Sequence, residues 1–418
     1  MFRRSVATAS AHAEQLRLWG CKLGIISVSE RNSARIIPVV FRPPTRLHPG
    51  RLIPLTPSCI LDITQPDGKS TILRPFQQMH FNNTYIIGCD WGSSAFRLRL
   101  IDLASGSVTT EIRSDMGVKA IHRIFQESPE NGSKSMHRQY RRHLGSEVQR
   151  LLSPLGIPAT GIPLVVSGMA SSSIGICELP YATLPFRLSG EDAVIHHMPA
   201  DDSFSNDMLL VSGVRSEGDV MRGEETEMMG LLPQLRQVHE ELDDALLLLP
   251  GTHSKHIRIS GDSMIDFRTF MTGELFSMLC AHSVLRESVS MPGQGALKGE
   301  DEAALRQGVE RAADGNLLND IFSVRTRHLL HGLAKSGNAY HLSGILLGHE
   351  LQAIPDESNG KIILHGASPL SDLYAIALHH LGMSARVIRP DRELADRASV
   401  AGQLLLFSRS MASSPEGV

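Results

Sequence analysis

The stretch that decides the fold is YIIGCDWGSSAFRLRLID, residues 85–102. Its first run, Tyr85 to Cys89, is continuously apolar, as expected for a strand that is covered on both faces. The run from Phe96 to Ile101 alternates between apolar and basic residues, which is typical of a second strand. Between the runs lie a carboxylate, a glycine and two hydroxyls, Asp90 to Ser94. The stretch therefore predicts two strands joined by a tight polar turn.

This turn has two interpretations. Its backbone N–H groups could face a phosphate while the Asp90 carboxylate holds a hydrated Mg²⁺. Because Asp, Gly and Ser are also common turn formers, an ordinary β-hairpin explains the same residues. Other signals along the chain have to decide between a phosphoryl-transfer enzyme and a bare hairpin.

The composition is that of a globular protein and excludes several functional classes. The chain has 418 residues, 42% hydrophobic and 20% charged, enough for two or three domains. Its net charge of −3 argues against a nucleic-acid binder, and no apolar run approaches the ~18 residues that cross a membrane. The five cysteines are scattered without a CxxC, which indicates a reducing, cytoplasmic compartment and no zinc site.

The first 80 residues differ from the rest in charge. They hold 11 Lys and Arg and 4 acids, a net +7, which leaves −10 for the remainder because the whole chain carries −3. Three interpretations compete: an organellar transit peptide, a disordered basic tail, and non-native upstream sequence with Met79 as the true start. We favour the last two, because folded-looking sequence begins abruptly at Asn83. We therefore predict a leader over 1–82.

Downstream of the first two strands, the pattern mixes strands and helices. We expect a short third strand and turn over 115–120, a helix over 135–152, strands over 163–167 and 209–213, and a helix over 223–232 that Pro233 closes. Residues 236–244 are polar and acidic, and we interpret them as a connecting segment.

A second unit begins as the first one did. A buried strand over 245–249 is followed by the turn Pro250 to Lys255 and by two more strands. Helices over 272–285, 300–313 and 316–335 and two strand–Gly–helix units, 339–351 and 362–381, complete it. The repeated order predicts a duplicated α/β domain with a cleft between the halves. We place the domains at 83–240 and 241–408, with a tail at 409–418.

Two loops carry candidate chemistry beyond the first turn. The second turn lacks Walker A spacing, and a solvated hairpin accounts for its His253 and Lys255 equally well. Asp219 lies on a Gly-flanked loop before a helix, where it could accept a proton from a substrate hydroxyl. Its alternative is a structural acid, and the following Glu224 and Glu225 fit a helix-dipole role alone.

Three small-residue segments have weaker signals. The loop Ser167 to Gly175 is rich in hydroxyls, which suits a polyhydroxylated ligand, although free-loop behaviour explains it too. The segment Leu342 to Gly348 is best interpreted as packing glycines between domains. Gly366 to Ser368 follow a strand and precede a helix, so a flat ring could lie against them, but a capped βα turn is the simpler reading of this segment alone.

In this order, the segments resemble the 2-dehydro-3-deoxygalactonokinase family of sugar kinases, within the actin-like ATPase superfamily. The matching stretches run from about residue 84 to 405: DWGSSAFRLRL, VVSGMASSSIG, ELPY, GDVMRGEETEMMG, LPGTHSKHIRI, FRTFMTGELFSMLC, HLSGILLGHEL and LHGASPLSDLYAIAL. Three positions depart from the family pattern: Ser93-Ser94 replaces Thr-Thr or Thr-Asn, and His256 and Ile176-Cys177 stand where tryptophans are usual. The resemblance implies two actin-like (ribonuclease-H-like) domains that close over a cleft.

The same resemblance implies ATP-dependent phosphorylation of 2-dehydro-3-deoxy-D-galactonate at its 6-hydroxyl, which supplies an aldolase in galactonate breakdown. ATP and Mg²⁺ are the expected cofactors and a small sugar acid the expected partner, without nucleic acid or membrane and with a homodimer as one option. Two alternatives stay open: a kinase of this fold for another sugar or sugar acid, and an actin- or chaperone-like ATP-dependent scaffold.

Site residues follow from the resemblance. Asp90 would organise Mg²⁺ through water, Asp219 would act as the base, and the Arg222 guanidinium would bind the substrate carboxylate in two contacts. The remaining candidates are backbone and small-residue positions. They are Gly92, Ser93, Ser94, Gly251, Thr252, Gly366, Ala367 and Ser368 for ATP, and Gly168, Met169 and Ser171 for the substrate.

Overall fold

The computed structural model describes residues 84–127, 133–239, 242–290, 297, 299–355 and 360–412, together with four strands nearer the N-terminus. Those strands form two antiparallel hairpins, β1 (Leu23–Glu30) with β2 (Ser33–Val40) and β3 (Leu61–Thr64) with β4 (Ser70–Leu73). The rest of the predicted leader and most of the 409–418 tail lie outside the described residues, so their nature stays a prediction. Both large sheets and all the described helices belong to the unit formed by residues 81–413.

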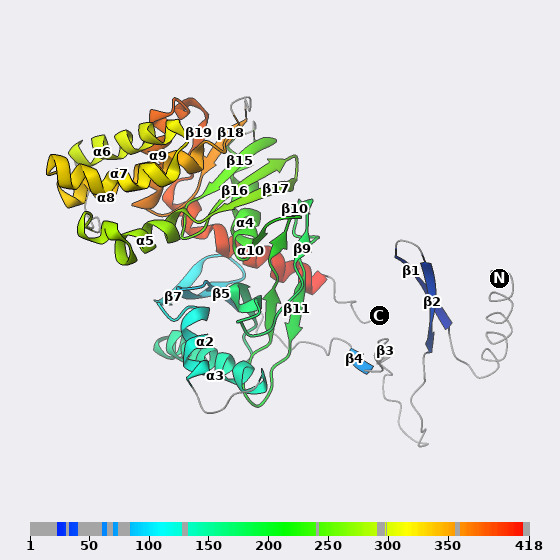
Figure 1. Ribbon diagram of the computed structural model, residues 1–418. Helices are drawn as coiled ribbons and strands as arrows, with labels where there is room; N and C mark the ends of the chain where they lie inside the picture. Colours follow the sequence, from blue (N-terminus) through cyan, green and yellow to red (C-terminus); the bar gives the residue numbers. More distant parts are fainter. Residues whose placement is uncertain are drawn as a thin grey trace, which may run out of the picture. The chain divides into compact units, whose positions relative to one another are not determined.

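The first half of this unit is built on a six-stranded sheet (Figure 1). Its order is β11-β12-β8-β5-β6-β7. The bounds are β5 (Tyr85–Trp91), β6 (Phe96–Asp102), β7 (Val108–Ser114), β8 (Leu164–Gly168), β11 (Ile195–Met198) and β12 (Met208–Val211). Strands β5, β6 and β7 form an antiparallel meander, and β8 and β12 then add in parallel beside β5.

A second six-stranded sheet repeats this arrangement. Its order is β10-β17-β16-β15-β18-β19. The bounds are β10 (Phe186–Arg187), β15 (Asp244–Leu249), β16 (Ser254–Ser260), β17 (Ser263–Phe270), β18 (Lys361–Leu364) and β19 (Val387–Ile388). Again an antiparallel meander, β15 to β17, is followed by two strands that add in parallel. The predicted actin-like pair of α/β domains is therefore confirmed, while the boundary at 240/241 stays a prediction, since β10 joins the second sheet from the first half.

Helices fill three layers around the two sheets (Figure 1). Helices α2 (Val118–Gln126) and α3 (Ser133–Leu152) cover the outer face of the first sheet. Helices α4 (Glu224–Arg236) and α10 (Arg392–Ala412) lie between the sheets. Helices α6 (Gly299–Arg311), α8 (Lys335–Leu351) and α9 (Leu370–His380) cover the outer face of the second sheet, and α5 (Thr272–His282) and α7 (Leu317–His331) pack on α8. Within the described residues, no helix is both long and apolar enough to span a bilayer.

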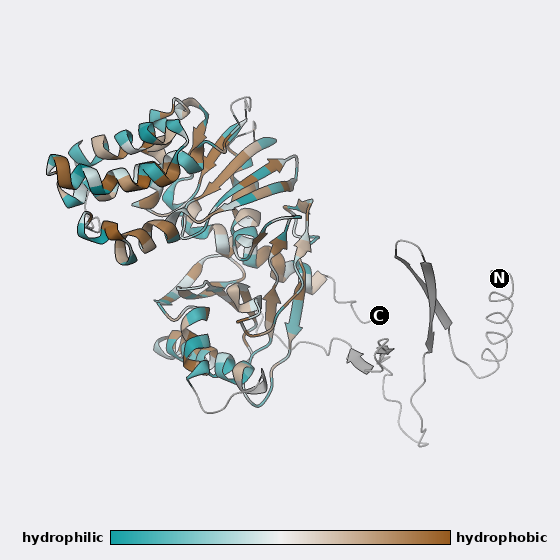
Figure 2. Cartoon of the chain, viewed as in Figure 1, coloured by the Kyte–Doolittle hydropathy of each residue, from teal (hydrophilic) through white to brown (hydrophobic). Residues whose placement is uncertain are grey.

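Both faces of each sheet are buried, and the apolar runs of the inner strands are therefore continuous. The central strands are accordingly brown in Figure 2. In β15, Ala245, Leu247 and Leu249 face the core that α4 and α10 share with both sheets. The alternate residues Leu246 and Leu248 face α6, α8 and α9. This period-two division joins the two sheets through a common core.

The third strand was predicted in the wrong place. It is β7, Val108–Ser114, whereas 115–120 contains a loop and the first residues of α2. Strand β7 lies at the edge of its sheet, and none of its side chains is fully buried. Its sequence, VTTEIRS, therefore lacks the apolar run that marked the inner strands.

Pro233 does not close α4, which contrary to the prediction continues to Arg236. A proline inside a helix removes one backbone hydrogen bond and clashes with the preceding turn. Here the helix lies between the sheets, and its apolar side chains are buried there: Met228, Met229, Leu231, Leu232 and Leu235. This burial outweighs the local cost of the proline.

Residues 339–351 are entirely helical, so the predicted strand–Gly–helix unit there is wrong. Helix α8 is buried on almost every side, and a helix that is apolar all round has no amphipathic period to distinguish it from a strand. Its Gly344 packs against α6, where an added Cβ would lie 2.9 Å from the carbonyl carbon of Leu305. The glycines thus pack two helices of the same half of the molecule.

Candidate active site

The first turn is held by its own hydrogen bond and by the start of α2. The Gly92 N–H donates to the Ala95 carbonyl (2.9 Å). The N–H groups of Val118 and Lys119 donate to the carbonyls of Gly92 (3.0 Å) and Ser93 (3.1 Å). The first two residues of α2 therefore bind the turn, which stands at the end of β5 directly after Asp90.

Three chain segments meet beside this turn. Gly168, at the end of β8, has φ +92°, and an added Cβ would lie 2.7 Å from the Trp91 carbonyl oxygen. Gly223, just before α4, has φ +108°, and its Cβ would lie 3.3 Å from the Gly168 Cα. Only glycine adopts such a backbone without strain. The ends of β5 and β8 and the start of α4 thus converge, bringing Asp90 near Glu224.

The site next to the first turn is acidic. Burial raises the pKa of Asp90, and Arg97 and Arg99 oppose that rise. Partial burial, with Asp90 and Glu224 nearby, raises the pKa of Glu227 to about 8. Clustered carboxylates of this kind favour a cation as their ligand.

Lys255 links the second turn to this acidic cluster. Its side chain, on β16, is buried, and its Nζ lies 3.1 Å from Glu224 Oε1 and donates to the His253 carbonyl (3.2 Å). The second carboxylate oxygen of Glu224 is covered and has no hydrogen-bond partner among the described residues. From the sequence, only a helix-dipole role was predicted for Glu224. Its place directly after Gly223 in the quoted motif was the signal that could have revealed its part in the site.

The second turn rests on the start of α5. The Glu274 N–H donates to the Thr252 carbonyl (2.9 Å), and an added Cβ on Gly273 would lie 2.9 Å from the Thr252 Cα. A cavity of about 90 Å³ opens here between α5, α8 and α9. It is lined by Gly251, Thr272, Gly273, Phe276, Ser343, Leu346, Leu347, Leu370, Leu373 and Tyr374.

The loop that precedes α9 lies against the same turn. An added Cβ on Gly366 would meet the Pro250 ring at 3.2 Å. Ala367 and Ser368 are exposed, and the Ala367 carbonyl accepts from the Ser371 N–H (3.2 Å) at the start of α9. The structure therefore brings the two predicted nucleotide segments, 251–252 and 366–368, to neighbouring positions.

Arg222 lies over the loop that follows β8. Its guanidinium donates to Ser171 Oγ (2.8 Å) and to the Leu179 carbonyl (3.1 Å), and its Cζ stands 4.0 Å from the centre of the Tyr181 ring. Its Nε is covered and has no partner among the described residues. Arg222 and Ser171, both predicted for the substrate, are thus in contact, and Tyr181 of the ELPY motif joins them although no role was predicted for it.

Asp219 has an extensive set of partners. Its carboxylate accepts from the N–H (2.6 Å) and the hydroxyl (2.9 Å) of Thr269 on β17, and from the Val220 N–H (2.7 Å). These bonds tie the loop before α4 to the second sheet. The predicted role of Asp219 as base stays a prediction, and Glu224, with one oxygen unpartnered, is a second candidate.

Comparison with known proteins identifies the family. The family model for 2-keto-3-deoxy-galactonokinase matches residues 90–404. A relative from Rhizobium meliloti, "Probable 2-dehydro-3-deoxygalactonokinase DgoK1", is 30% identical over 329 residues, which cover 77% of this chain and 97% of the relative. The 2-dehydro-3-deoxygalactonokinase of Escherichia coli is 29% identical over 237 residues, 55% of this chain and 74% of its own length.

A solved structure agrees with these sequence relatives. A crystal structure from Sinorhizobium meliloti, also named for 2-dehydro-3-deoxygalactonokinase, shares 30% identity and a TM-score of 0.62 over 80% of this chain and 98% of that one. The family model over residues 90–404 and this structure agree on the same family. The chain belongs to the 2-keto-3-deoxy-galactonokinase family and is a sugar-acid kinase.

Proposed function

We propose that this kinase transfers the γ-phosphate of ATP to the 6-hydroxyl of 2-dehydro-3-deoxy-D-galactonate, as a step of galactonate catabolism. The observation that carries the proposal is the convergence of Asp90, Glu224 and Lys255 at the ends of two equivalent turns. Phosphoryl transfer needs mainly positioning and charge neutralisation, which an acid and a buried lysine at the junction of two sheets can supply. The names of the curated relatives support the choice of sugar acid.

The nucleotide would lie along the second turn. Gly251 and Thr252 would hold the β-phosphate side, and Gly366, Ala367 and Ser368 would border the adenine. The adjoining cavity is lined mostly by apolar side chains, as is usual for sites that take a flat ring. Gly92, Ser93 and Ser94 would face the transferring phosphate from the other turn.

The acidic cluster fits a magnesium ion held largely by water. Among the described residues, no group of three or more His, Cys, Asp and Glu side chains is arranged to hold a metal by itself. Mg²⁺ keeps several waters and commonly uses one or two carboxylates together with substrate phosphates. Asp90 would be that carboxylate, and the ion would neutralise phosphate charge when bound.

The sugar acid would bind beside Arg222. The unpartnered Nε of Arg222 leaves a buried donor unsatisfied, a cost that a substrate carboxylate would remove. Ser171, Gly168 and Met169 would complete this side, with Tyr181 holding the guanidinium in place. Asp219 would act as the base, and Glu224, whose Oε2 has no hydrogen-bond partner among the described residues, is a second candidate.

The main alternative is a kinase of this fold that acts on another sugar or sugar acid. A cytoplasmic location and a homodimer also remain proposals; the scattered cysteines support the first of them. These alternatives differ only in which compound accepts the phosphate, so one assay with several acceptors distinguishes them.

The test is ADP release by the full chain with Mg²⁺–ATP and a panel of 2-keto-3-deoxy sugar acids, aldoses and polyols. Turnover with the galactonate-derived acid alone supports the proposal. Turnover with another compound instead would show that the chain is a kinase for a substrate other than the one proposed. Slow hydrolysis that ignores every sugar would refute the proposed reaction.

A further inference from the structure

Glu350, near the end of α8, lies at the centre of a buried hydrogen-bond network. It belongs to the HLSGILLGHEL stretch, in which a packing role was predicted for Leu342 to Gly348 and no role for Glu350. Its side chain is 1% exposed, yet it carries a carboxylate, and a buried carboxylate is costly unless its oxygens are satisfied. The identity of its partners therefore shows what this acid organises.

Three side chains donate to Glu350. His256 Nε2, on β16, lies 3.0 Å from Oε1, and the Tyr374 hydroxyl, on α9, lies 2.9 Å and 2.7 Å from the two oxygens. The Thr272 hydroxyl, at the first residue of α5, donates to Oε2. Ser254 adds a bond of 2.7 Å to the Tyr374 hydroxyl. Burial beside Glu350 raises the pKa of Tyr374, so this hydroxyl keeps its proton and donates.

The partners of Glu350 are the elements that surround the proposed nucleotide site. Thr272 begins the helix on which the second turn rests, and it lines the cavity together with Tyr374. Tyr374 lies in the first turns of α9, which follows the predicted adenine segment 366–368. His256 and Ser254 lie on β16, directly after the second turn. One carboxylate thus holds α5, α9 and β16 together beneath the turn.

We propose that Glu350 is a positioning residue for the nucleotide: through Thr272 and Tyr374 it holds the starts of α5 and α9 where the second turn and the adenine segment need them. This inference rests on the proposed function, since it assumes that the nucleotide lies along that turn. Glu350 itself touches neither substrate. Misplacing a binding segment by a fraction of an ångström weakens binding without removing any contact residue.

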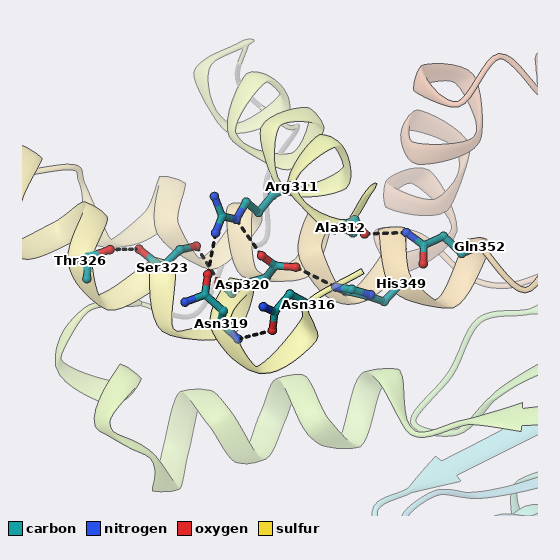
Figure 3. Close-up of polar contacts among 9 residues, drawn as sticks. All are labelled: Arg311, Ala312, Asn316, Asn319, Asp320, Ser323, Thr326, His349 and Gln352. Atoms are coloured by element: carbon teal, nitrogen blue, oxygen red, sulfur yellow. Dashed lines mark hydrogen bonds and ion pairs between the residues drawn. The ribbon is translucent and has the colours of Figure 1, made fainter. Parts of the chain in front are cut away.

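A second buried network, centred on α7 and reaching the neighbouring residue of α8, supplies a matched control (Figure 3). Asp320, on α7, is fully buried and accepts from Arg311 Nε (2.7 Å) and from His349 Nε2 (3.0 Å). His349 is the immediate neighbour of Glu350 in α8, but its network joins α6 and α7, which lie away from the second turn. Both networks centre on a buried carboxylate, and only one reaches the cavity.

The experiment compares Glu350→Gln with Asp320→Asn. We measure ADP affinity by titration calorimetry, KM for ATP and for the sugar acid, and the unfolding temperature. Glu350→Gln should weaken ADP and raise KM for ATP by about tenfold with little change in KM for the sugar acid. Asp320→Asn should lower the unfolding temperature and leave ADP affinity within about twofold of wild type.

A second pair covers the case in which Glu350→Gln does not fold. Thr272→Val replaces the α5 hydroxyl by a methyl group, whereas Thr272→Ser keeps the hydroxyl, so the valine variant should weaken ADP binding and the serine variant should not. Unchanged ADP affinity in Glu350→Gln or in Thr272→Val, or equal weakening in Asp320→Asn, overturns the inference alone. If the wild-type chain binds no nucleotide, the proposed function fails, and the inference fails with it.

Discussion

The turns after β5 and β15 occupy equivalent places in their two sheets, because in each sheet an antiparallel meander is followed by two strands that add in parallel. The chemistry of the two turns is nevertheless opposite. Each is bound by the first N–H groups of a helix, Lys119 to the Ser93 carbonyl in one and Glu274 to the Thr252 carbonyl in the other. The first turn adjoins the acids Asp90 and Glu227, whereas the second ends in the buried Lys255. The two turns therefore share one backbone arrangement but differ in charge. The acids beside the first turn suit a cation, and the lysine at the second turn suits an anion.

The largest effect should come from the base that connects the two turns. Glu224→Gln removes the carboxylate that faces Lys255, and Asp219→Asn removes the one that accepts from Thr269. Loss of a general base lowers turnover by about 10²–10⁴-fold, so whichever acid takes the proton should show that loss in kcat with ADP affinity retained. Steady-state kinetics and titration calorimetry on both variants check this.

The other variant of that pair acts as the internal control. If Asp219 is only structural, Asp219→Asn should lower the unfolding temperature and leave kcat within about tenfold, because it loses hydrogen bonds to β17. Near-normal turnover in both variants would exclude both acids as the base.

The next largest effect should come from a change at Asp90, which alters the acidic side of the site and leaves the second turn intact. Asp90→Asn should lower kcat by about 10²-fold at every concentration of sugar acid, since it weakens the use of Mg²⁺–ATP rather than sugar binding. Initial rates over a grid of Mg²⁺ and sugar-acid concentrations measure it. Recovery of the rate by more sugar acid alone would show that Asp90 serves the sugar and not the metal.

The shared scaffold can be tested by the same change on both sides. Gly117 and Gly273 stand where each helix meets its turn, and an added Cβ would lie 2.5 Å from the Ser93 carbonyl oxygen or 2.9 Å from the Thr252 Cα. We expect Gly273→Ala to raise KM for ATP by about tenfold and Gly117→Ala to lower kcat by a similar factor, because each displaces its own turn. Activity and unfolding temperature of both variants are the measurements.

Gly337 is the matched control for these substitutions. It lies in α8, and an added Cβ would meet nothing within 4 Å. Gly337→Ala should therefore keep wild-type kinetics and gain about 0.5–1 kcal/mol of stability, since alanine restricts the unfolded chain. Equal kinetic losses at all three glycines would contradict a role specific to the turns.

The sequence predicts the inner strands and both turns because buried strands carry an unbroken apolar run and end at small polar residues. It does not predict β7, whose edge position leaves a mixed pattern, or α8, whose burial on every side removes the helical period. Position in the chain also cannot reveal contacts across it. The pairs Lys255–Glu224 and Asp219–Thr269 join residues 31 and 50 apart, so they appear only once the sheets are assembled.

The smallest effect concerns the protonated acid on the acidic side. Glu227 has a pKa raised to about 8 in the fold, against about 4.3 in an unfolded chain. Between these values the folded state holds a proton that the unfolded state has lost, so this group makes stability fall as pH rises from about 4.3 to about 8. Glu227→Gln should remove that slope, and the gain in unfolding temperature over wild type should grow with pH to about 2–4 °C near pH 8. The gain stays small because the side chain is 37% exposed and solvent screens it.

Calorimetric scans between pH 5 and pH 8 measure this gain in unfolding temperature, with the exposed Glu393→Gln on α10 as control. A constant offset across this range would mean that Glu227 is ionised in the fold, and the acidic side would then carry a full extra charge opposite Lys255.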